Sequence, residues 1–340
     1  FMGLLVRDYL LYPESVVAGL AVQGLSFPKG LVPWGPWALL FGLCGIAFVM
    51  MLTRPRARHR GLAALLCAGA VAVYVCDWVQ PALSEHLSPR TPYLRYLRLA
   101  TSEEPLASYR VSARLREAYE RTPTRDFDLA ADAVQYLDAK ERRWLLLGPE
   151  AFSSLDRDFR KQTGRHLFVA DARSGQLWLA TSEAVRGEQD RNPLTARVLA
   201  VAPEPQNPVH AVFGHRTELL GYDLHLPGED FVRAGQGFGI TWYWRVLEPM
   251  PENYEVFVHI DGLGRRLHGD HAPVAGHYPT ELWEPGDIIV DAQRLRVPAH
   301  LRPGNYSIYV GLFSGDERLK LVQGPDDGGN RARVGTLPVR

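Results

Sequence analysis

The sequence predicts a multi-domain membrane protein with a transmembrane α-hairpin, a small α/β domain and an antiparallel Ig-like β-sandwich, in that order. Three observations predict this. Residues 31–53 carry no charged side chain and are followed by arginines at every second position from Arg54 to Arg60. Helix-like and strand-like patterns alternate over residues 92–200. From residue 208 to residue 340 the strand-like patterns stand alone.

The N-terminal segment, residues 1–30, is expected to lie at the membrane interface or to re-enter the membrane without crossing it. Val16–Phe27 is apolar but too short to span, and charged residues interrupt what precedes it. No charged segment with a following cleavage site is present, which excludes a signal peptide. Because the first residue is Phe1 rather than Met, we expect a fragment or processed product of a longer membrane protein.

Two transmembrane helices are expected over about residues 31–53 and 61–82, within the segment 31–84. Each run approaches the roughly 20 apolar residues that a helix needs to cross a bilayer. Trp34 and Trp37 mark an interface at the start of the first helix. The loop 54–60 is rich in arginine and is therefore expected on the cytoplasmic side. Residues after about 90 then lie in the periplasm or extracellular space, which corresponds to a bacterial inner membrane protein.

Composition excludes several classes of partner and site. Lys and Arg together number 38 and so do Asp and Glu, so the net charge is zero. With no basic stripe, nucleic acid is not an expected partner. All three cysteines, Cys44, Cys67 and Cys76, lie in the membrane segments. The outer region therefore has no disulfide and no cysteine metal site.

The α/β domain is expected over residues 92–200, including a linker that begins near Gly187. No glycine-rich phosphate loop follows any of its strands, which favours a spacer or docking role over nucleotide binding. Its expected elements are a helix over Phe127–Leu137, a buried strand Trp144–Leu147, a helix Ala151–Gln162 with Gly164 as C-cap, and strands His166–Ala170 and Leu177–Thr181.

The sandwich is expected over residues 208–340. Short apolar or alternating runs are separated there by Asp-Gly and Pro-Gly turns, without helices between them. The expected strands are Thr217–Leu226, Gly239–Val246, Tyr254–Ile260, Ile288–Val297 and Tyr306–Phe313.

A polar cluster of histidines and an acid gathers in the middle of the sandwich: His259, His268, Asp270 and His271. Its spacing matches no zinc signature, so we expect loop polarity and turn-stabilising hydrogen bonds, and no metal site is assigned. A metal site that uses these side chains, or a calcium site at Asp270, remains the alternative.

Aromatic side chains suggest a surface on which sugars could stack. Flat exposed rings are the usual platform for sugars, and the candidates for ligand binding are Trp242, Trp244, Tyr278 and Trp283. The alternative is that they form the core, since Trp242 and Trp244 share one face of a strand. We expect at least half of the aromatic set to be buried.

The sandwich carries a string of motifs that resembles a known family. The string runs through Leu220-Gly221-Tyr222-Asp223, Tyr254-x-Val256-Phe257-Val258-His259, Asp270-His271-x-Pro273, Gly276-x-Tyr278-Pro279-Thr280, Trp283-x-Pro285-Gly286, Asp291 and Val310-Gly311-Leu312-Phe313. It is similar to the C-terminal extracytoplasmic sandwich of bacterial GT-C-type glycosyltransferases. These belong to glycosyltransferase family 39 and are similar to dolichyl-phosphate-mannose–protein mannosyltransferases. The resemblance covers most of residues 31–340.

The resemblance implies a role outside the catalytic centre. In that family the catalytic acid lies in the first outer loop, ahead of many spans, and no residue here matches it, so no catalytic residue is assigned. The resemblance implies a polyprenyl-phosphate sugar donor for the whole enzyme and an upstream catalytic transmembrane bundle, with no cofactor in this chain. The outer domains would then position a glycan, lipid or polypeptide acceptor.

Two further functions remain open from the sequence. One is a membrane-anchored carbohydrate-binding or adhesion module, and the other is a structural subunit of an envelope complex. A hydrolase is disfavoured because no paired carboxylates or nucleophile elbow stand out in the outer region.

Overall fold

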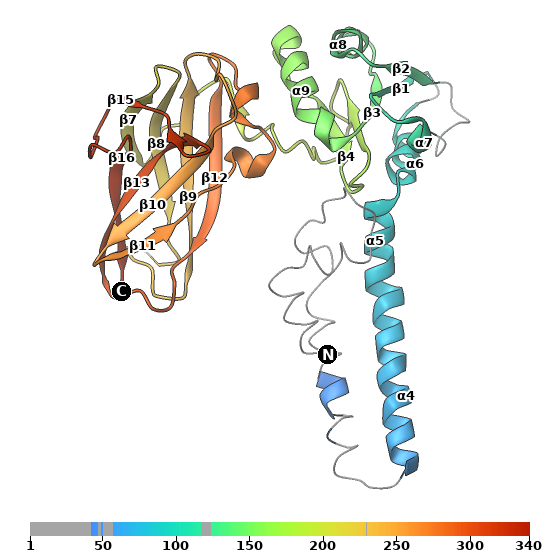
Figure 1. The fold of residues 1–340 in the computed structure, drawn as a ribbon. Coiled ribbons are helices and arrows are strands. Elements are labelled where there is room, and N and C mark those ends of the chain that lie inside the picture. Colours follow the sequence, from blue (N-terminus) through green and yellow to red (C-terminus); the bar gives the residue numbers. More distant parts are fainter. Residues whose placement is uncertain (1–41, 47–48, 50–56, 102, 117–123, 229) are drawn as a thin grey trace. The chain divides into compact units, whose positions relative to one another are not determined.

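The computed structural model describes residues 42–46, 49, 57–101, 103–116, 124–228 and 230–340. Within these ranges the chain is rich in β-structure, with strands in three sheets and a smaller number of helices (Figure 1). It divides into two compact units, Phe1–Arg191 and Asn192–Arg340. The prediction of a β-rich C-terminal domain is confirmed.

A long helix leads into the folded part of the first unit. α4 (Ala57–Tyr74) continues through a π-helical segment, η1 (Val75–Val79), into α5 (Gln80–Leu87) (Figure 1). Within the described residues, one helix, Leu65–Leu87, is long and apolar enough to cross a membrane by length and composition, and 7% of its apolar window is buried. Its large side chains, such as Leu65 at 72% exposed, are left uncovered by the described chain.

The remaining membrane predictions fall partly outside the described residues. Segment 1–30 lies outside them entirely, and of the first expected span only residues 42–46 and 49 are described, as helix. The expected loop 54–60 overlaps the start of α4, so residues 57–60 are helical rather than loop. The second expected span, 61–82, is helical throughout, and the helix continues to Leu87.

The end of this helix is joined closely to the folded part of the first unit. Gly175 N donates to the carbonyl oxygen of His86 at 2.8 Å, and the His86 side chain is buried. A Cβ atom on Gly175 would lie 2.6 Å from the His86 ring. Only glycine permits this approach, so the position holds α5 against the loop before β5.

A mixed five-stranded sheet forms the core of the first unit, in the order β2-β1-β3-β5-β4. β1 is parallel to β2 and β3, whereas β5 is antiparallel to β3 and β4. The strands are β1 (Leu106–Tyr109), β2 (Thr124–Phe127), β3 (Trp144–Leu147), β4 (Phe168–Asp171) and β5 (Trp178–Thr181). All four residues of β3 are fully buried, as its continuous apolar run predicts.

Among the described residues, the helices that accompany this sheet are α6 (Arg90–Leu99), α7 (Ala113–Arg116), α8 (Ala130–Leu137) and α9 (Pro149–Thr163). α9 begins with proline at its first turn and buries Phe152, Leu155 and Phe159 on one face. It ends at Gly164 in the left-handed conformation, with φ 70°, so the predicted C-cap is confirmed.

The helix expected over Phe127–Leu137 starts later than predicted. α8 begins at Ala130, and residues 124–127 form the edge strand β2. Asp126 accepts a hydrogen bond from the Ser108 hydroxyl and lies 2.5 Å from Arg116 Nη1. Asp126 therefore belongs to a strand, in which Ser108 and Arg116 are its partners.

The second unit consists of two antiparallel sheets that Figure 1 shows as two layers. One has the order β15-β7-β8-β9-β12-β6 and the other β11-β10-β13-β14, with β16 also paired to β13. The first contains β6 (Val198–Leu199), β7 (Asn207–Phe213), β8 (Thr217–His225), β9 (Gly237–Val246), β12 (Ile288–Arg296) and β15 (Leu321–Gln323). The second contains β10 (Glu255–Gly262), β11 (Arg265–His268), β13 (Gly304–Ser314), β14 (Glu317–Arg318) and β16 (Ala332–Val339).

Two short 3₁₀ helices, η3 (Pro273–Gly276) and η4 (Thr280–Leu282), connect β11 to β12. Inward-facing residues alternate along the strands, and Val256, Val258 and Ile260 of β10 are all fully buried. β6 pairs with β12. Part of the stretch expected as a linker, Gly187–Asn207, therefore belongs to the second unit, which starts at Asn192.

Candidate functional site

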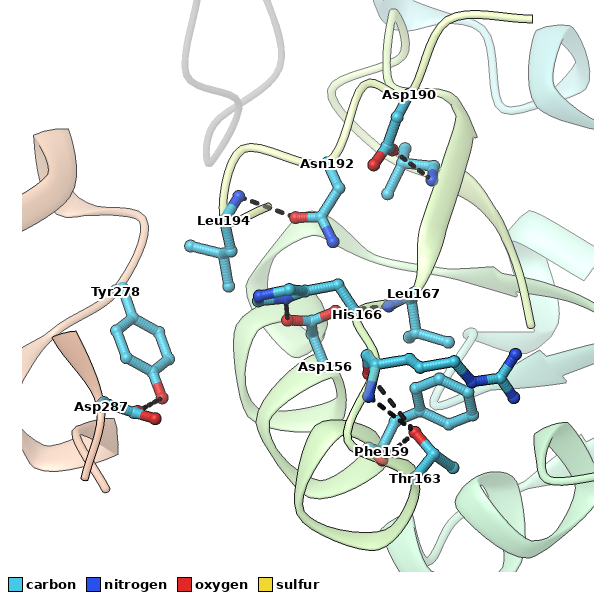
Figure 2. Close-up of polar contacts among 12 residues, drawn as sticks. Asp156, Phe159, Thr163, His166, Leu167, Asp190, Asn192, Leu194, Tyr278 and Asp287 are labelled. Atoms are coloured by element: carbon cyan, nitrogen blue, oxygen red, sulfur yellow. Dashed lines mark hydrogen bonds and ion pairs between the residues drawn. The ribbon is translucent and has the colours of Figure 1, made fainter. Parts of the chain in front are cut away.

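The four aromatic residues predicted to bind a ligand lie in the interior of the second unit. Trp242, Trp244 and Tyr278 are 0% exposed and Trp283 is 1% exposed. Tyr278 and Trp283 are also linked directly, since Trp283 Nε1 donates a hydrogen bond to the Tyr278 carbonyl at 3.1 Å. The Tyr278 hydroxyl lies 3.4 Å from Asp287 Oδ2 (Figure 2). A sugar-stacking surface made of these four rings is therefore wrong, and the core interpretation holds.

The outward face of the six-stranded sheet carries a groove instead. It has a volume of about 600 Å³ and runs along β8, β9 and β12. The polar or small residues that line it are Arg197, His225, Gly237, Gly239, Thr241, Ala292, Gln293 and Arg294. The larger apolar residues that line it are Leu226, Pro227, Phe238 and Leu295. We call this surface the sheet groove.

The sheet groove exists because β9 places its smallest residues outward. Successive strand residues face opposite sides, so Phe238 and Ile240 are buried while Gly237 and Gly239 face out. A Cβ atom on Gly239 would lie 3.4 Å from the His225 side chain, an ordinary contact. Gly239 therefore lets the His225 side chain approach the strand closely, and a larger residue here would crowd His225 and extend into the groove. Glycine inside a strand often marks such a close approach, and Gly237-x-Gly239 is the sequence signal that points to this site.

The polar groups of the sheet groove are mostly donors. His225 Nε2 lies 3.0 Å from the Thr241 hydroxyl. Among the described residues, neither the Arg197 nor the Arg294 guanidinium forms an ion pair, and none of the lining residues is acidic. Two arginines, a histidine and a hydroxyl suit a ligand with many hydroxyl groups and negative charge.

A carboxylate beside the groove is already engaged. Asp223 Oδ2 accepts a hydrogen bond from the Tyr243 hydroxyl at 2.6 Å, and Asp223 Oδ1 accepts one from Gln206 N at 2.7 Å. Burial, together with the hydrogen bond and charge of Asp223, raises the pKa of Tyr243 to about 12. Asp223 therefore does not neutralise the groove arginines directly.

The predicted polar cluster separates into two parts. His259, His268 and Asp270 come together, with one possible ligand atom from each lying within 4.8 Å of the others. Burial and then the positive charge of Arg266 lower the pKa of His259 to about 4, so its ring is neutral at physiological pH.

His271 belongs to a different contact. Its Nε2 lies 2.8 Å from Asp291 Oδ2 and its Nδ1 lies 2.8 Å from the Gly269 carbonyl. Burial alone lowers the pKa of His271, but the hydrogen bond and charge of Asp291 outweigh it and the pKa is raised. Asp291 is fully buried and lies 20 positions later in the sequence. The sequence therefore groups His271 with its neighbour Asp270, although its partner in the structure is Asp291.

The sequence does not single out Asp156, a buried carboxylate of the first unit. Asp156 of α9 is fully buried, and its Oδ2 lies 2.7 Å from His166 Nδ1 (Figure 2). Asp156 Oδ1 accepts a hydrogen bond from Leu167 N at 2.8 Å. These bonds tie the middle of α9 to the segment that leads from α9 into β4, which is a structural role.

Comparison with known proteins gives distant structural matches alone. No protein-family model matches this chain, and no curated protein matches it. The C-terminal domain of Wzt matches with 14% identity, a TM-score of 0.30, and coverage of 41% of this chain and 82% of that one. The CARDB domain of a Pyrococcus furiosus protein in complex with di-metal ions matches with 14% identity, a TM-score of 0.23 and coverage of 37% and 94%. A Niemann-Pick type C2 protein from the Japanese carpenter ant matches with 10% identity, a TM-score of 0.25 and coverage of 41% and 99%. These likenesses are too weak to support an assignment.

Proposed function

We propose that this chain is the C-terminal, non-catalytic part of an integral-membrane glycosyltransferase of the GT-C type, in which the β-sandwich binds the acceptor. The sheet groove is the observation that supports acceptor binding. The motif string from Leu220 to Phe313 supports the enzyme class by resemblance. The donor would be a polyprenyl-phosphate sugar, and the transfer itself would occur in an upstream transmembrane bundle.

The proposed membrane arrangement rests on the charge pattern and the long helix. Leu65–Leu87 would be the last span, and the arginines before it would hold its N-terminal end in the cytoplasm. Both folded units would then lie on the periplasmic side. The close packing of Gly175 on His86 would hold the first unit at the end of this span.

The acceptor's chemistry follows from the lining of the sheet groove. Unpaired guanidinium groups bind carboxylates and phosphates in two-pronged contacts, and hydroxyl groups of sugars pair with His225 and Thr241. A volume of about 600 Å³ suits a few sugar residues. The two guanidinium groups therefore favour an anionic glycan as the acceptor, and the apolar residues Leu226, Phe238 and Leu295 would contact the faces of its sugar rings.

Binding is tested with the full chain in lipid nanodiscs and a panel of neutral and acidic oligosaccharides. We expect an acidic oligosaccharide to bind, and Arg294→Ala to weaken it about tenfold, since a hydrogen bond to a charged group contributes about 1.5–3 kcal/mol. Gly239→Val, which fills the groove while suiting a strand, should also weaken binding. Arg265→Ala removes an exposed arginine outside the groove and is the matched control. Equal affinities for Arg294→Ala and Arg265→Ala would refute the groove as the binding site.

Transfer is tested in membranes that contain the full-length gene product. The measurement is the transfer of labelled hexose from polyprenyl phosphate to the oligosaccharide. We expect Gly239→Val to raise KM for the acceptor and to leave KM for the donor unchanged. An absence of transfer by the natural protein would contradict the enzyme class, and binding without transfer would favour a carbohydrate-binding module. An unchanged acceptor KM would contradict the role of the groove.

A further inference from the structure

A two-residue turn aligns two histidines on the second sheet. β10 and β11 are joined by Leu263 and Gly264, which both have positive φ, at 51° and 70°. Such a turn matches the natural twist of a hairpin and fixes its register. In this register His259 lies directly opposite His268, so both side chains lie on the same face.

Asp270 completes a set of three ligand groups. It follows β11, and its Oδ1 accepts a hydrogen bond from Val258 N at 3.0 Å, which fixes the carboxylate beside the two rings. His259 Nε2 lies 3.8 Å from Asp270 Oδ1, and His268 Nδ1 lies 3.9 Å from Asp270 Oδ2. Both separations exceed the length of a hydrogen bond. They are close to the separation of about 3.3 Å between ligands of a tetrahedral ion with bonds of about 2.0–2.1 Å.

His259 is a buried side chain, 6% exposed. Its Nε2 is the nitrogen that faces Asp270, and at 3.8 Å from Asp270 Oδ1 it lies beyond hydrogen-bond length of that carboxylate. A bound ion would therefore engage Nε2, whereas Nδ1, which has no hydrogen-bond partner among the described residues, points elsewhere on the ring. His268 and Asp270, whose side chains are 61% and 36% exposed, have room to rotate toward His259. The three ligand atoms lie within 4.8 Å of one another, so coordination requires movements of up to about 1.5 Å to reach a separation of about 3.3 Å.

The charges near this cluster do not exclude a cation. Arg266 approaches it but forms a two-pronged contact with Asp261, at 2.6 and 2.8 Å. Arg331 also bonds to Asp261, at 3.0 Å, and to Asp327, at 2.5 Å. Two arginines and two aspartates thus form a network without net charge. The charge of a third arginine, Arg318, also acts on His259, and its guanidinium donates to the Gly329 carbonyl at 2.8 Å. The Asp270 carboxylate is the acid that offsets this arginine and would offset a bound cation.

We propose that His259, His268 and Asp270 form a binding site for a divalent transition metal ion of the zinc class on the outward face of the β10–β11 hairpin. Two imidazole nitrogens and one carboxylate oxygen suit zinc-class ions, whereas calcium and magnesium prefer sets made of oxygen alone. Three protein ligands leave one position open to water or to an oxygen of a ligand. This site is independent of the sheet groove and of the proposed transferase function.

The test uses the full chain without a histidine tag, stripped with a chelator and held in nanodiscs. Zinc ions alone are titrated by calorimetry, with calcium ions as the comparison. We expect one equivalent of zinc to bind and calcium not to compete. Loss of a group that merely orients a metal ligand weakens metal binding by about tenfold or more. Removing a direct ligand should cost more than that, so His268→Ala and Asp270→Asn should each weaken zinc binding by more than about tenfold. Asparagine keeps an oxygen for Val258 N and so preserves the local fold.

His300→Ala removes an exposed histidine elsewhere in the second unit and should leave zinc affinity unchanged. Substitution with Co²⁺ should give the absorption bands of a four-coordinate site in the natural protein and in His300→Ala, but not in His268→Ala. The proposal is overturned if zinc does not bind saturably at one equivalent. It is also overturned if His268→Ala and His300→Ala bind zinc equally, or if calcium binds more tightly than zinc.

Discussion

A buried carboxylate, Asp291, holds the loop between β11 and β12 in an unusual backbone conformation. Its Oδ1 accepts a hydrogen bond from Val274 N at 2.9 Å, and its Oδ2 lies 2.8 Å from His271 Nε2. Val274 and Ala275 have φ of 53° and 54°, in the left-handed region that costs residues with a side chain about 1–2 kcal/mol each. Asp291 therefore stabilises a strained turn and pairs with a buried histidine at the same time.

The expected cost of Asp291→Ala follows from these contacts. The substitution leaves His271 and Val274 N without their partner in the interior, and breaking a buried ion pair from one side costs about 3–5 kcal/mol. Asp291→Asn keeps an oxygen for Val274 N and loses the charge, so its cost should be smaller, about 1–3 kcal/mol. The free energy of unfolding of the second unit should therefore fall in the order natural protein, asparagine, alanine.

Hydrogen exchange read by mass spectrometry measures this, because it reports the opening of each unit separately. Peptides from β9 and β12 should lose protection by the amounts given above, while peptides from β3 should not change. Asp316→Ala, in the exposed turn between β13 and β14, is the control. A loss below about 1 kcal/mol for Asp291→Ala, or equal losses for all three variants, would refute the reasoning.

Further predictions concern pH, a helix end and topology. The raised pKa of Tyr243, from 10.0 to about 12, means that the unfolded chain ionises first, so stability is lost as pH rises from 10 to 12. Over this pH range the free energy of unfolding of Tyr243→Phe, measured by chemical denaturation, should fall by on the order of 2 kcal/mol less than that of the natural protein. An unchanged dependence on pH would contradict the assignment. Gly164→Val should cost the first unit about 1 kcal/mol or more in a thermal shift assay, because φ is 70° there; an unshifted transition would argue against this cap. In a variant without the native cysteines, Arg58→Cys should react with an impermeant maleimide from the cytoplasmic side and Asp316→Cys from the outer side, whereas labelling from one side would exclude the proposed topology.

The sequence predicts well where one local pattern decides the structure. Trp144–Leu147 is a strand with the predicted bounds because the run is wholly apolar and buried on both faces. Gly164 ends α9 as predicted because no other residue type adopts its conformation as readily. The helix predicted from Phe127 starts three residues later, at Ala130, because Phe127 ends the edge strand β2, in which Asp126 is held by Ser108, 18 positions earlier in the chain.

The candidate site depends on contacts between distant segments, which patterns do not reveal. His271 contacts Asp291 rather than its neighbours in the sequence. His259 and His268 lie opposite each other because the turn between β10 and β11 sets the register of the two strands. The four buried aromatics have the residue types of a sugar platform, and only the packing of two sheets decides that they face inward. The groove residues come from β8, β9 and β12 and from Arg197, which the sequence assigns to a linker.

The position of β16 in the second sheet sets an order for biosynthesis. β13 pairs with β10 on one side and with β16 on the other, and Arg340 N donates to the Val232 carbonyl at 3.0 Å. The hairpins of β7, β8 and β9 form from neighbouring segments soon after synthesis, but the long strand β13 keeps an unpaired edge until residues 332–339 have emerged. A nascent chain therefore exposes an aggregation-prone edge until β16 pairs with β13, and a chaperone that covers this edge would act during that interval.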